Sequence, residues 1–154
     1  MLDQPDTNYW TATGYRVPDT PHNTVKLDEA GFKLVPVTRN APRSFITNIH
    51  DGASMSAGVP TTARGIAFGG DCGVARVGLS IDDGKSWQPT QLGADKGKYG
   101  FRLWQAQFTL PARGPHTLMV RCTNTKNEAQ PDFRVWNPAG YMFNTVEATR
   151  VVAT

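Results

Sequence analysis

The sequence has only two cysteines, no long apolar run and no basic leader, and each lack excludes a class of protein. A membrane-spanning helix needs about eighteen or more consecutive apolar residues, so we expect no membrane span. Cys72 and Cys122 have a spacing that matches no zinc or haem motif, and a disulfide between two strands stays open. We expect two thiols, because Cys122 lies in LMVRCT as a small apolar strand residue would. The chain as given shows no export signal.

Recognised catalytic patterns are also lacking. The sequence contains no G-x-S-x-G elbow, no glycine-rich phosphate loop, no H-E-x-x-H motif and no paired cysteine ligand site. We therefore assign no catalytic residue and no metal ligand. The net charge is +3, but the basic residues are scattered and form no known reader motif, so we expect no nucleic-acid binding.

What is present indicates an all-β, loop-rich protein: 39% of residues are hydrophobic, 15 are glycine and 11 are proline. Residues 1–49 are mostly turns and have too few periodic apolar positions to build a core. From residue 50 onward, short apolar segments alternate with turns at about eight to twelve residues, the spacing of an immunoglobulin-like β-sandwich. We predict an irregular extension at 1–49 and a sandwich of about seven antiparallel strands at 50–154. The predicted strands include 32–37, 44–47, 63–68, 74–81, 101–108, 117–123 and 146–152.

A β-hairpin is predicted around the motif VARVGLSIDDGKSW. Val77 and Leu79 alternate with non-apolar residues, which is typical of a half-buried strand. Asp82 and Gly84 have the chemistry of a tight turn, and we expect Trp87 to fold back over the apolar face. The motif also matches the Asp-box of sialidase-like propellers, but it occurs once in a chain too short for a propeller. We interpret Asp82, Gly84 and Trp87 as structural turn residues.

A second segment, WNPAGYMFN, places large side chains beside proline and glycine in a long connection. It is predicted to be a packed, specific loop, which either covers the edge of the sandwich or meets a partner. The candidate residues for a dimer interface or partner packing are Trp136, Tyr141, Met142 and Phe143. The aromatic residues of the extension have few apolar neighbours in the sequence, so we expect them to pack against the β domain or against something outside this chain. They are Tyr9, Trp10 and Tyr15.

Five blocks of the sequence, taken in order, resemble the C-terminal domain of the sulfite oxidase and sulfite dehydrogenase family. The blocks are RGIAFGG, VARVGLSIDDGKSW, FRLWQ, RC followed by QP, and WN followed by GY; they cover roughly residues 60–150. The extension, with YRVP at 15–18 and RSFIT at 43–47, is similar to the final stretch of the family's molybdenum-cofactor domain in its bacterial branch.

The resemblance implies a homodimerising domain of an enzyme that oxidises sulfite at a molybdenum centre and passes electrons to an acceptor such as a cytochrome c. It implies an upstream molybdenum-cofactor domain and a periplasmic location. The molybdenum cofactor belongs to the parent enzyme; none is expected on this chain alone, because neither cysteine stands in a matching context. In some relatives a basic residue after the Trp-Asn pair helps to bind the substrate. Residues 138–144 hold no arginine here, so Arg16 is the candidate for substrate binding.

Three hypotheses follow. In the first, the chain is the end of a cofactor domain followed by a complete dimerisation domain, and it is not catalytic by itself. In the second, it is a subunit of a sulfite dehydrogenase complex and completes an active site on another chain. In the third, it is a carbohydrate-binding or adhesion β-sandwich that uses Trp104 or Trp136. The exact sulfur substrate and the electron acceptor stay open.

Overall fold

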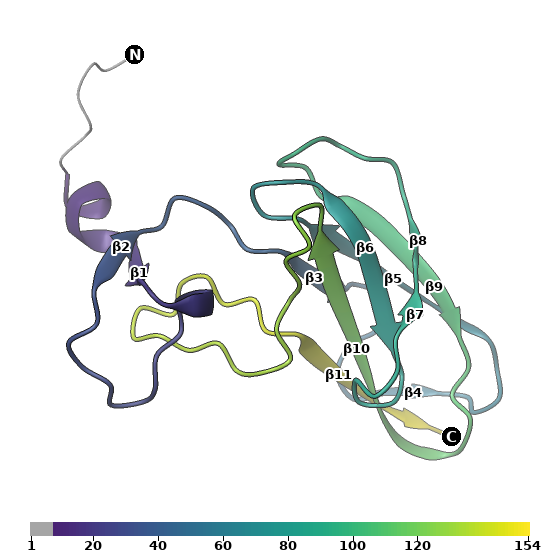
Figure 1. Cartoon of the computed structure of the whole chain (residues 1–154). Helices are drawn as coiled ribbons and strands as arrows, with labels where there is room; N and C mark the ends of the chain where they lie inside the picture. Colours follow the sequence, from purple (N-terminus) through teal and green to yellow (C-terminus); the bar gives the residue numbers. More distant parts are fainter. Residues whose placement is uncertain (1–7) are drawn as a thin grey trace.

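Two antiparallel-rich sheets stack face to face in the computed structural model, which describes residues 8–154 without the side chain of residue 11 (Figure 1). The five-stranded sheet has the order β4-β11-β10-β6-β7, and the four-stranded sheet has the order β3-β5-β9-β8. The strands are β3 (Arg43–Ile46), β4 (Ala53–Met55), β5 (Thr61–Phe68), β6 (Val74–Ser80), β7 (Gln88–Pro89), β8 (Gln91–Leu92), β9 (Arg102–Phe108), β10 (Gly114–Asn124) and β11 (Glu147–Ala153). The predicted all-β sandwich is therefore confirmed, and the immunoglobulin-like designation stays a prediction.

The core lies between the sheets and follows the period-two alternation of the strands. In β10, Leu118, Val120 and Cys122 are buried, while Met119 and Arg121 lie on the outer face. The sequence predicted this division, because successive side chains of a strand point to opposite faces. The facing sheet contributes Ala63, Ala67, Trp104, Ala106 and Phe108.

The four-stranded sheet closes tightly around one glycine. Gly65 pairs with Trp104 in the β5–β9 ladder. A Cβ atom at this position would overlap the carbonyl oxygen of Phe45 and lie 2.5 Å from Trp104 Cζ2. The Trp104 indole donates a hydrogen bond to the carbonyl oxygen of Ile66 at 3.2 Å, so its one polar atom is satisfied inside the core. The absent side chain of Gly65 thus makes room for the largest core residue.

The predicted hairpin forms, but its tryptophan lies on the other face. β6 pairs with the short return strand β7, and Val77 and Leu79 are buried as expected. The Trp87 ring covers Gly78, where an added Cβ would lie 3.3 Å from Trp87 Cε3. Gly78 faces outward, so the expectation that Trp87 covers the apolar face is wrong. The inner face of the five-stranded sheet is already covered by the four-stranded sheet. On the outer face, Gly78 has no side chain, so the Trp87 indole can pack directly on its backbone.

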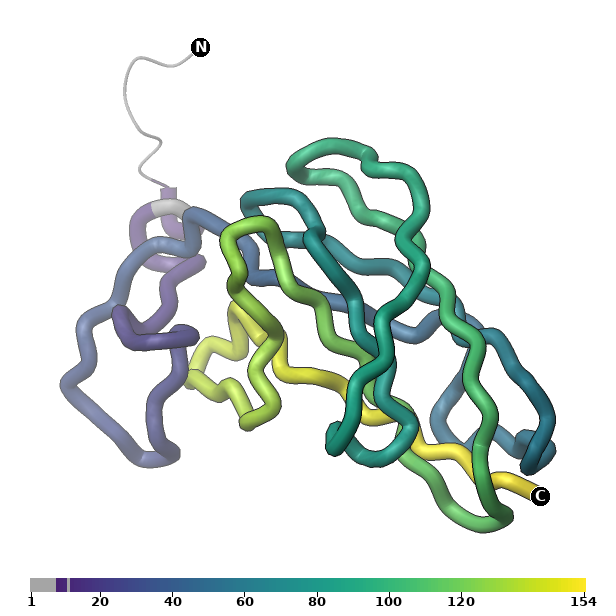
Figure 2. The backbone as a smooth tube through the Cα atoms, turned by 45° about the vertical axis from the view of Figure 1, so that its right-hand side comes forward, coloured from purple at the N-terminus to yellow at the C-terminus, as the bar shows by residue number. Residues whose placement is uncertain are grey.

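The extension forms a small layer of its own beside the sandwich (Figures 1 and 2). Its strands β1 (Arg16–Pro18) and β2 (Leu34–Pro36) pair antiparallel, and it carries the π-helix η1 (Trp10–Gly14) and the 3₁₀-helix η2 (Pro21–Asn23). The strand predicted at 32–37 corresponds to β2; its partner β1, and β4, β7 and β8, were not predicted. β3 belongs to the sandwich although it precedes residue 50. No helix within residues 8–154 is long and apolar enough to cross a membrane.

Candidate functional site

The extension is joined to the sandwich through residues 130–145, which we call the junction loop; in Figure 2 this yellow-green segment lies beside the purple and blue extension. The backbone N–H of Val25 donates to the carbonyl oxygen of Trp136 at 3.0 Å. The Thr24 hydroxyl accepts from the Trp136 N–H at 2.9 Å and donates to its carbonyl at 3.0 Å. Asn137 Nδ2 donates to the carbonyl of Asn23 at 3.0 Å. Trp136 is therefore engaged with this chain's own extension.

Buried amides connect the junction loop to the sandwich. Gln130 is 1% exposed, and its Oε1 accepts the backbone N–H of Cys122 at 2.9 Å while its Nε2 donates to the carbonyl of Asn144 at 3.2 Å. Asn144 Nδ2 in turn donates to the carbonyl of Pro42 at 3.3 Å. Because a buried polar group is costly when it lacks a partner, this chain of amides fixes the position of the loop.

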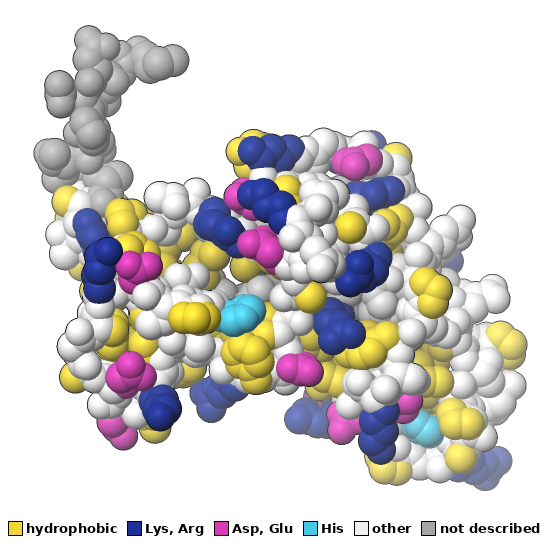
Figure 3. Space-filling view, viewed as in Figure 1, with side chains coloured by type: hydrophobic (Ala, Val, Ile, Leu, Met, Phe, Trp, Pro, Cys, Tyr) yellow, Lys and Arg dark blue, Asp and Glu magenta, His cyan; other side chains and the backbone are white. Residues whose placement is uncertain are grey.

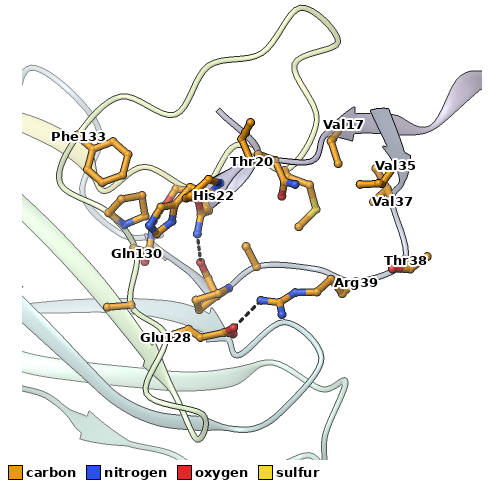
Figure 4. Close-up of a pocket in the computed structure, with 18 of the residues that line it drawn as sticks. Val17, Thr20, His22, Val35, Val37, Thr38, Arg39, Glu128, Gln130 and Phe133 are labelled. Carbon is orange, nitrogen blue, oxygen red and sulfur yellow. Dashed lines mark hydrogen bonds and ion pairs between the residues drawn. The ribbon is translucent and has the colours of Figure 1, made fainter. Parts of the chain in front are cut away.

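A cleft of about 740 Å³ lies between the extension and the junction loop (Figure 4). Val17 and Phe133 line it with apolar surface, and the His22 ring meets Phe133 edge-on at 5.1 Å between centroids. At its base, Arg39 Nη2 lies 2.7 Å from Glu128 Oε1. The hydrogen bond from Arg39 lowers the pKa of the Glu128 carboxyl below its ordinary value. This ion pair links the extension to the sandwich, and the charges of Arg39 and Glu128 neutralise each other.

Arg16, the candidate for substrate binding, lies at the start of β1. Its Nε donates to the carbonyl of Ala12 at 2.9 Å, and its Nη1 lies 3.5 Å from the carbonyl of Leu34. Two of the five guanidinium N–H groups therefore serve the fold of the extension, and the other three make no hydrogen bond to the part of the chain that the structure describes. Nothing in these contacts tests the predicted role.

The aromatic residues of the extension stack toward the sandwich. The rings of Tyr9, Trp10, Tyr15 and Tyr141 follow one another with centroid separations of 5.2, 5.7 and 5.3 Å. The last step joins the extension to the junction loop, which agrees with the expectation that these residues pack against the β domain. Tyr9, Trp10 and Tyr15 still remain more than half exposed. Much of this aromatic series is thus open to a partner.

The outer face of the four-stranded sheet carries an apolar row, which we define as Phe45, Ile66 and Leu103. These residues lie side by side because β3, β5 and β9 pair in register at Phe45–Ile66 and Ile66–Leu103. Leu103 is 61% exposed. The Arg43 guanidinium carbon lies 4.6 Å from the Phe45 ring centroid and 5.4 Å from that of Phe143. The apolar row is thereby continuous with the junction loop.

The four predicted interface residues therefore lie in different surroundings. Phe143 is exposed and adjoins the apolar row, whereas Trp136 is half-buried. Tyr141 and Met142 are half-buried and line a smaller cleft of about 340 Å³ together with Tyr15. Their predicted role at an interface stays a prediction. Sequence reasoning missed the apolar row, although the alternation in FRLWQAQF that sends Trp104 inward also sends Leu103 outward.

The hairpin residues make hydrogen bonds within their own turn. Asp82 Oδ1 accepts the N–H of Ser86 at 2.9 Å and the hydroxyl of Ser80 at 2.7 Å, and Oδ2 accepts the Ser86 hydroxyl at 2.6 Å. These bonds, first those from Ser86, lower the pKa of Asp82 to about 2. Gly84 has φ +80°, which glycine adopts without strain. The carboxylate is occupied by structural bonds.

The donor set of residues 8–154 does not fit a molybdenum centre. Within residues 8–154, no three His, Cys, Asp or Glu side chains are grouped to hold a metal ion. Cys72 and Cys122 are free thiols and buried, and their Sγ atoms donate to the carbonyls of Gly69 and Phe68. Burial raises the pKa of the Cys122 thiol to about 12, so this sulfur is protonated and acts as a hydrogen-bond donor inside the core.

Comparison with known proteins assigns the two-sheet domain to a protein family. The family model for the Mo-co oxidoreductase dimerisation domain matches residues 40–152. The chain belongs to this family. The match begins just before β3, so this dimerisation domain covers both sheets and the junction loop.

Relatives of the dimerisation domain include mitochondrial sulfite oxidases. The proteins from Macaca fascicularis and Homo sapiens are 32% and 31% identical over 155 residues, which cover 92% of this chain and 27% of each relative. The chain thus spans about a quarter of the length of these relatives. The sulfane dehydrogenase SoxCD from Paracoccus pantotrophus has the same fold, with a TM-score of 0.65 and 19% identity over 95% of this chain and 36% of that chain.

Proposed function

We propose that this chain is the dimerisation domain of a molybdenum-dependent oxidoreductase that oxidises sulfite, and that it is not catalytic by itself. The family match and the sulfite oxidases among its relatives support the proposal. Since the donor set here does not fit molybdenum, the proposal assigns the cofactor to a separate molybdenum-cofactor domain. A periplasmic location and an electron acceptor such as a cytochrome c complete the proposal on family resemblance alone.

The apolar row is the observation that carries the proposed self-association. Phe45, Ile66 and Leu103 form an outward-facing band across three strands, and Phe143 extends it. A contiguous apolar patch on a sheet face is typical of an interaction site, and a two-fold axis through it would bury the same patch twice. We propose that two copies meet through this face, with the junction loop at its border.

Self-association is tested by exchanging single apolar residues for glutamate on the two outer faces. Leu103→Glu places a charge in the apolar row, and Val152→Glu is the matched control because Val152 is 45% exposed on β11 of the other sheet. We expect sedimentation velocity at tens of micromolar to show a dimer for the unmodified chain and for Val152→Glu, and a monomer for Leu103→Glu. A monomeric unmodified chain would contradict the proposal. If Val152→Glu alone is monomeric, the dimer interface lies on the outer face of the five-stranded sheet and the proposal is wrong.

A second candidate function is that the extension completes an active site on a cofactor-bearing chain. The exposed aromatic series and the remaining donors of Arg16 favour it, since aromatic and arginine side chains are enriched at interfaces. Coexpression with a sulfite dehydrogenase cofactor subunit, followed by molybdenum analysis and sulfite turnover, tests it. Arg16→Gln should raise KM for sulfite with little change in the amount of complex. Unchanged KM would remove Arg16 from the site.

Of the two tryptophans that the carbohydrate-binding hypothesis names, Trp104 is not accessible to a sugar. Trp104 is 2% exposed in the core and its indole N–H is bonded to the backbone, so it has no face to offer a sugar.

A further inference from the structure

A third recess, of about 460 Å³, lies on the outer face of the five-stranded sheet, opposite to the apolar row. Arg76, Arg121 and Trp87 line it, together with backbone around Gly78 and Pro89. In Figure 3, dark-blue Lys and Arg side chains gather over the region that β6 and β10 occupy in Figure 1. The recess thus combines two cations with an aromatic wall.

One of the two cations is held in place by the aromatic wall. The guanidinium carbon of Arg121 lies 4.3 Å from the Trp87 ring centroid, which is a cation–π contact. Trp87 in turn rests on the bare backbone of Gly78, the residue paired with Arg121 in the β6–β10 ladder. Stacking uses the face of the guanidinium and leaves its N–H edges free to bind an anion.

The second cation is a diagonal neighbour of the first. Arg76 pairs with Thr123 and Gly78 pairs with Arg121, so both arginines leave the same face of the sheet, two positions apart on adjacent strands. Diagonal neighbours of this kind are about 7–8 Å apart at Cα, a span that two long side chains close easily. Like charges in this arrangement repel unless an anion lies between them.

Among the residues that the structure describes, no carboxylate supplies that anion. Within residues 8–154, neither the Arg76 nor the Arg121 side chain takes part in an ion pair or a hydrogen bond. Two acids of the neighbouring loops are engaged elsewhere: Glu128 with Arg39 at 2.7 Å, and Asp71 with Lys126 at 2.9 Å.

We propose that Arg76 and Arg121 form a binding site for a small oxyanion group, such as a sulfate, a phosphate or a carboxylate, with Trp87 as the positioning residue for Arg121. Two guanidinium groups that converge on one recess match the paired oxygens of such a group. The site lies on the opposite sheet from the proposed dimer face and does not depend on the reaction of the parent enzyme.

The test is titration of the chain with sodium sulfate, sodium phosphate or sodium succinate at constant ionic strength, followed through the Trp87 indole signal in ¹H–¹⁵N spectra. The signal is assigned by its loss in Trp87→Phe. Constant ionic strength removes general screening from the readout. We expect saturable shifts with at least one anion. Sulfate or phosphate binding without succinate binding indicates a free tetrahedral anion, and succinate binding indicates that a partner's carboxylate is accepted.

Variants separate a built site from general attraction to a basic surface. Arg76→Gln and Arg121→Gln should each raise Kd at least about tenfold, and Arg121→Lys should bind more weakly than arginine because it lacks the planar fork. Arg113→Gln is the matched control, since Arg113 is exposed at the β9–β10 turn and makes no ion pair within residues 8–154, and it should leave Kd unchanged. Arg76 is exposed, so its variant folds even if the Arg121 variants do not. The proposal is overturned if no anion saturates, or if all three Gln variants behave alike.

Discussion

The sandwich and the junction are held together by different physics. The sandwich buries a continuous apolar core between two sheets, with Leu79 and Leu118 at 0% exposure. The junction buries valines that lie outside this core cluster, such as Val17 and Val135. It is also fastened by the amide of Gln130, by the Thr24 hydroxyl and by the Arg39–Glu128 ion pair between the extension and the sandwich. A close-packed apolar core is sensitive to added or lost volume, whereas a hydrogen-bonded contact is sensitive to the loss of a single partner. We therefore expect the two regions to respond differently to substitution and to pH.

The largest effect is expected in the sandwich. Gly65→Ala places a Cβ against the Phe45 carbonyl and the Trp104 ring, so β3 and β9 must move apart. Such overpacking should lower the free energy of unfolding by about 3 kcal/mol, measured by urea denaturation followed by tryptophan fluorescence. Gly73→Ala is the control, because a Cβ there meets only Thr125 Cγ2 at an ordinary 3.5 Å. Equal stability of the two variants would show that β3 is loosely held.

A smaller and more local effect is expected at the junction. Gln130→Leu keeps the volume but leaves the N–H of Cys122 and the carbonyl of Asn144 without this partner. We expect a loss of about 1–2 kcal/mol, with faster hydrogen exchange at 130–145 than in β5 and β9. If exchange rises equally in all three segments, the junction and the sandwich unfold as one unit, and the two regions are not held together independently.

The smallest effect is the pH response of the ion pair at the junction. Because Arg39 lowers the pKa of Glu128, the pair stabilises the folded chain above the ordinary pKa of a glutamate and loses this contribution as the pH falls through the lowered value. The pair is partly exposed, so the change is at most about 1 kcal/mol. Asp82 stays ionised to about pH 2, so the hairpin should outlast the junction on acidification.

Hydrogen exchange between pH 5 and pH 3, corrected for intrinsic rates, measures that order. The amides of residues 37–41 should lose protection before β6 does, and Glu128→Gln should remove the pH dependence at 37–41 while lowering protection there at pH 6. Loss of protection in β6 first would contradict the assignment of the acid-sensitive contact to the junction.

Much of the sandwich followed from local pattern. The alternation around Val77 and around Val120 predicted two central strands and their buried faces, because a strand that is covered on one side must alternate. The strands β4, β7 and β8 have two or three residues each, too few to show a period. The face chosen by Trp87 was also beyond local pattern, since it depends on a bare Gly78 and on Arg121 from another strand.

The candidate sites were predicted less completely, because each joins segments that are far apart in the chain. The interface residues at 136–143 were recognised by their aromatic character, but Thr24 contacts Trp136 across 112 positions. The apolar row exists only because the registers of β3, β5 and β9 bring Phe45, Ile66 and Leu103 onto one line. The recess of Arg76 and Arg121 likewise depends on the β6–β10 register.

The sequence by itself determined the all-β class, the main strands and the acid-glycine turn, since period-two hydrophobicity and turn chemistry act over a few residues. Tertiary structure alone decided which outer face carries the apolar row and which carries the recess of Arg76 and Arg121, where Trp87 lies, and how the extension is fastened. These features depend on strand order and register, which are set when the whole core closes and not by any one segment.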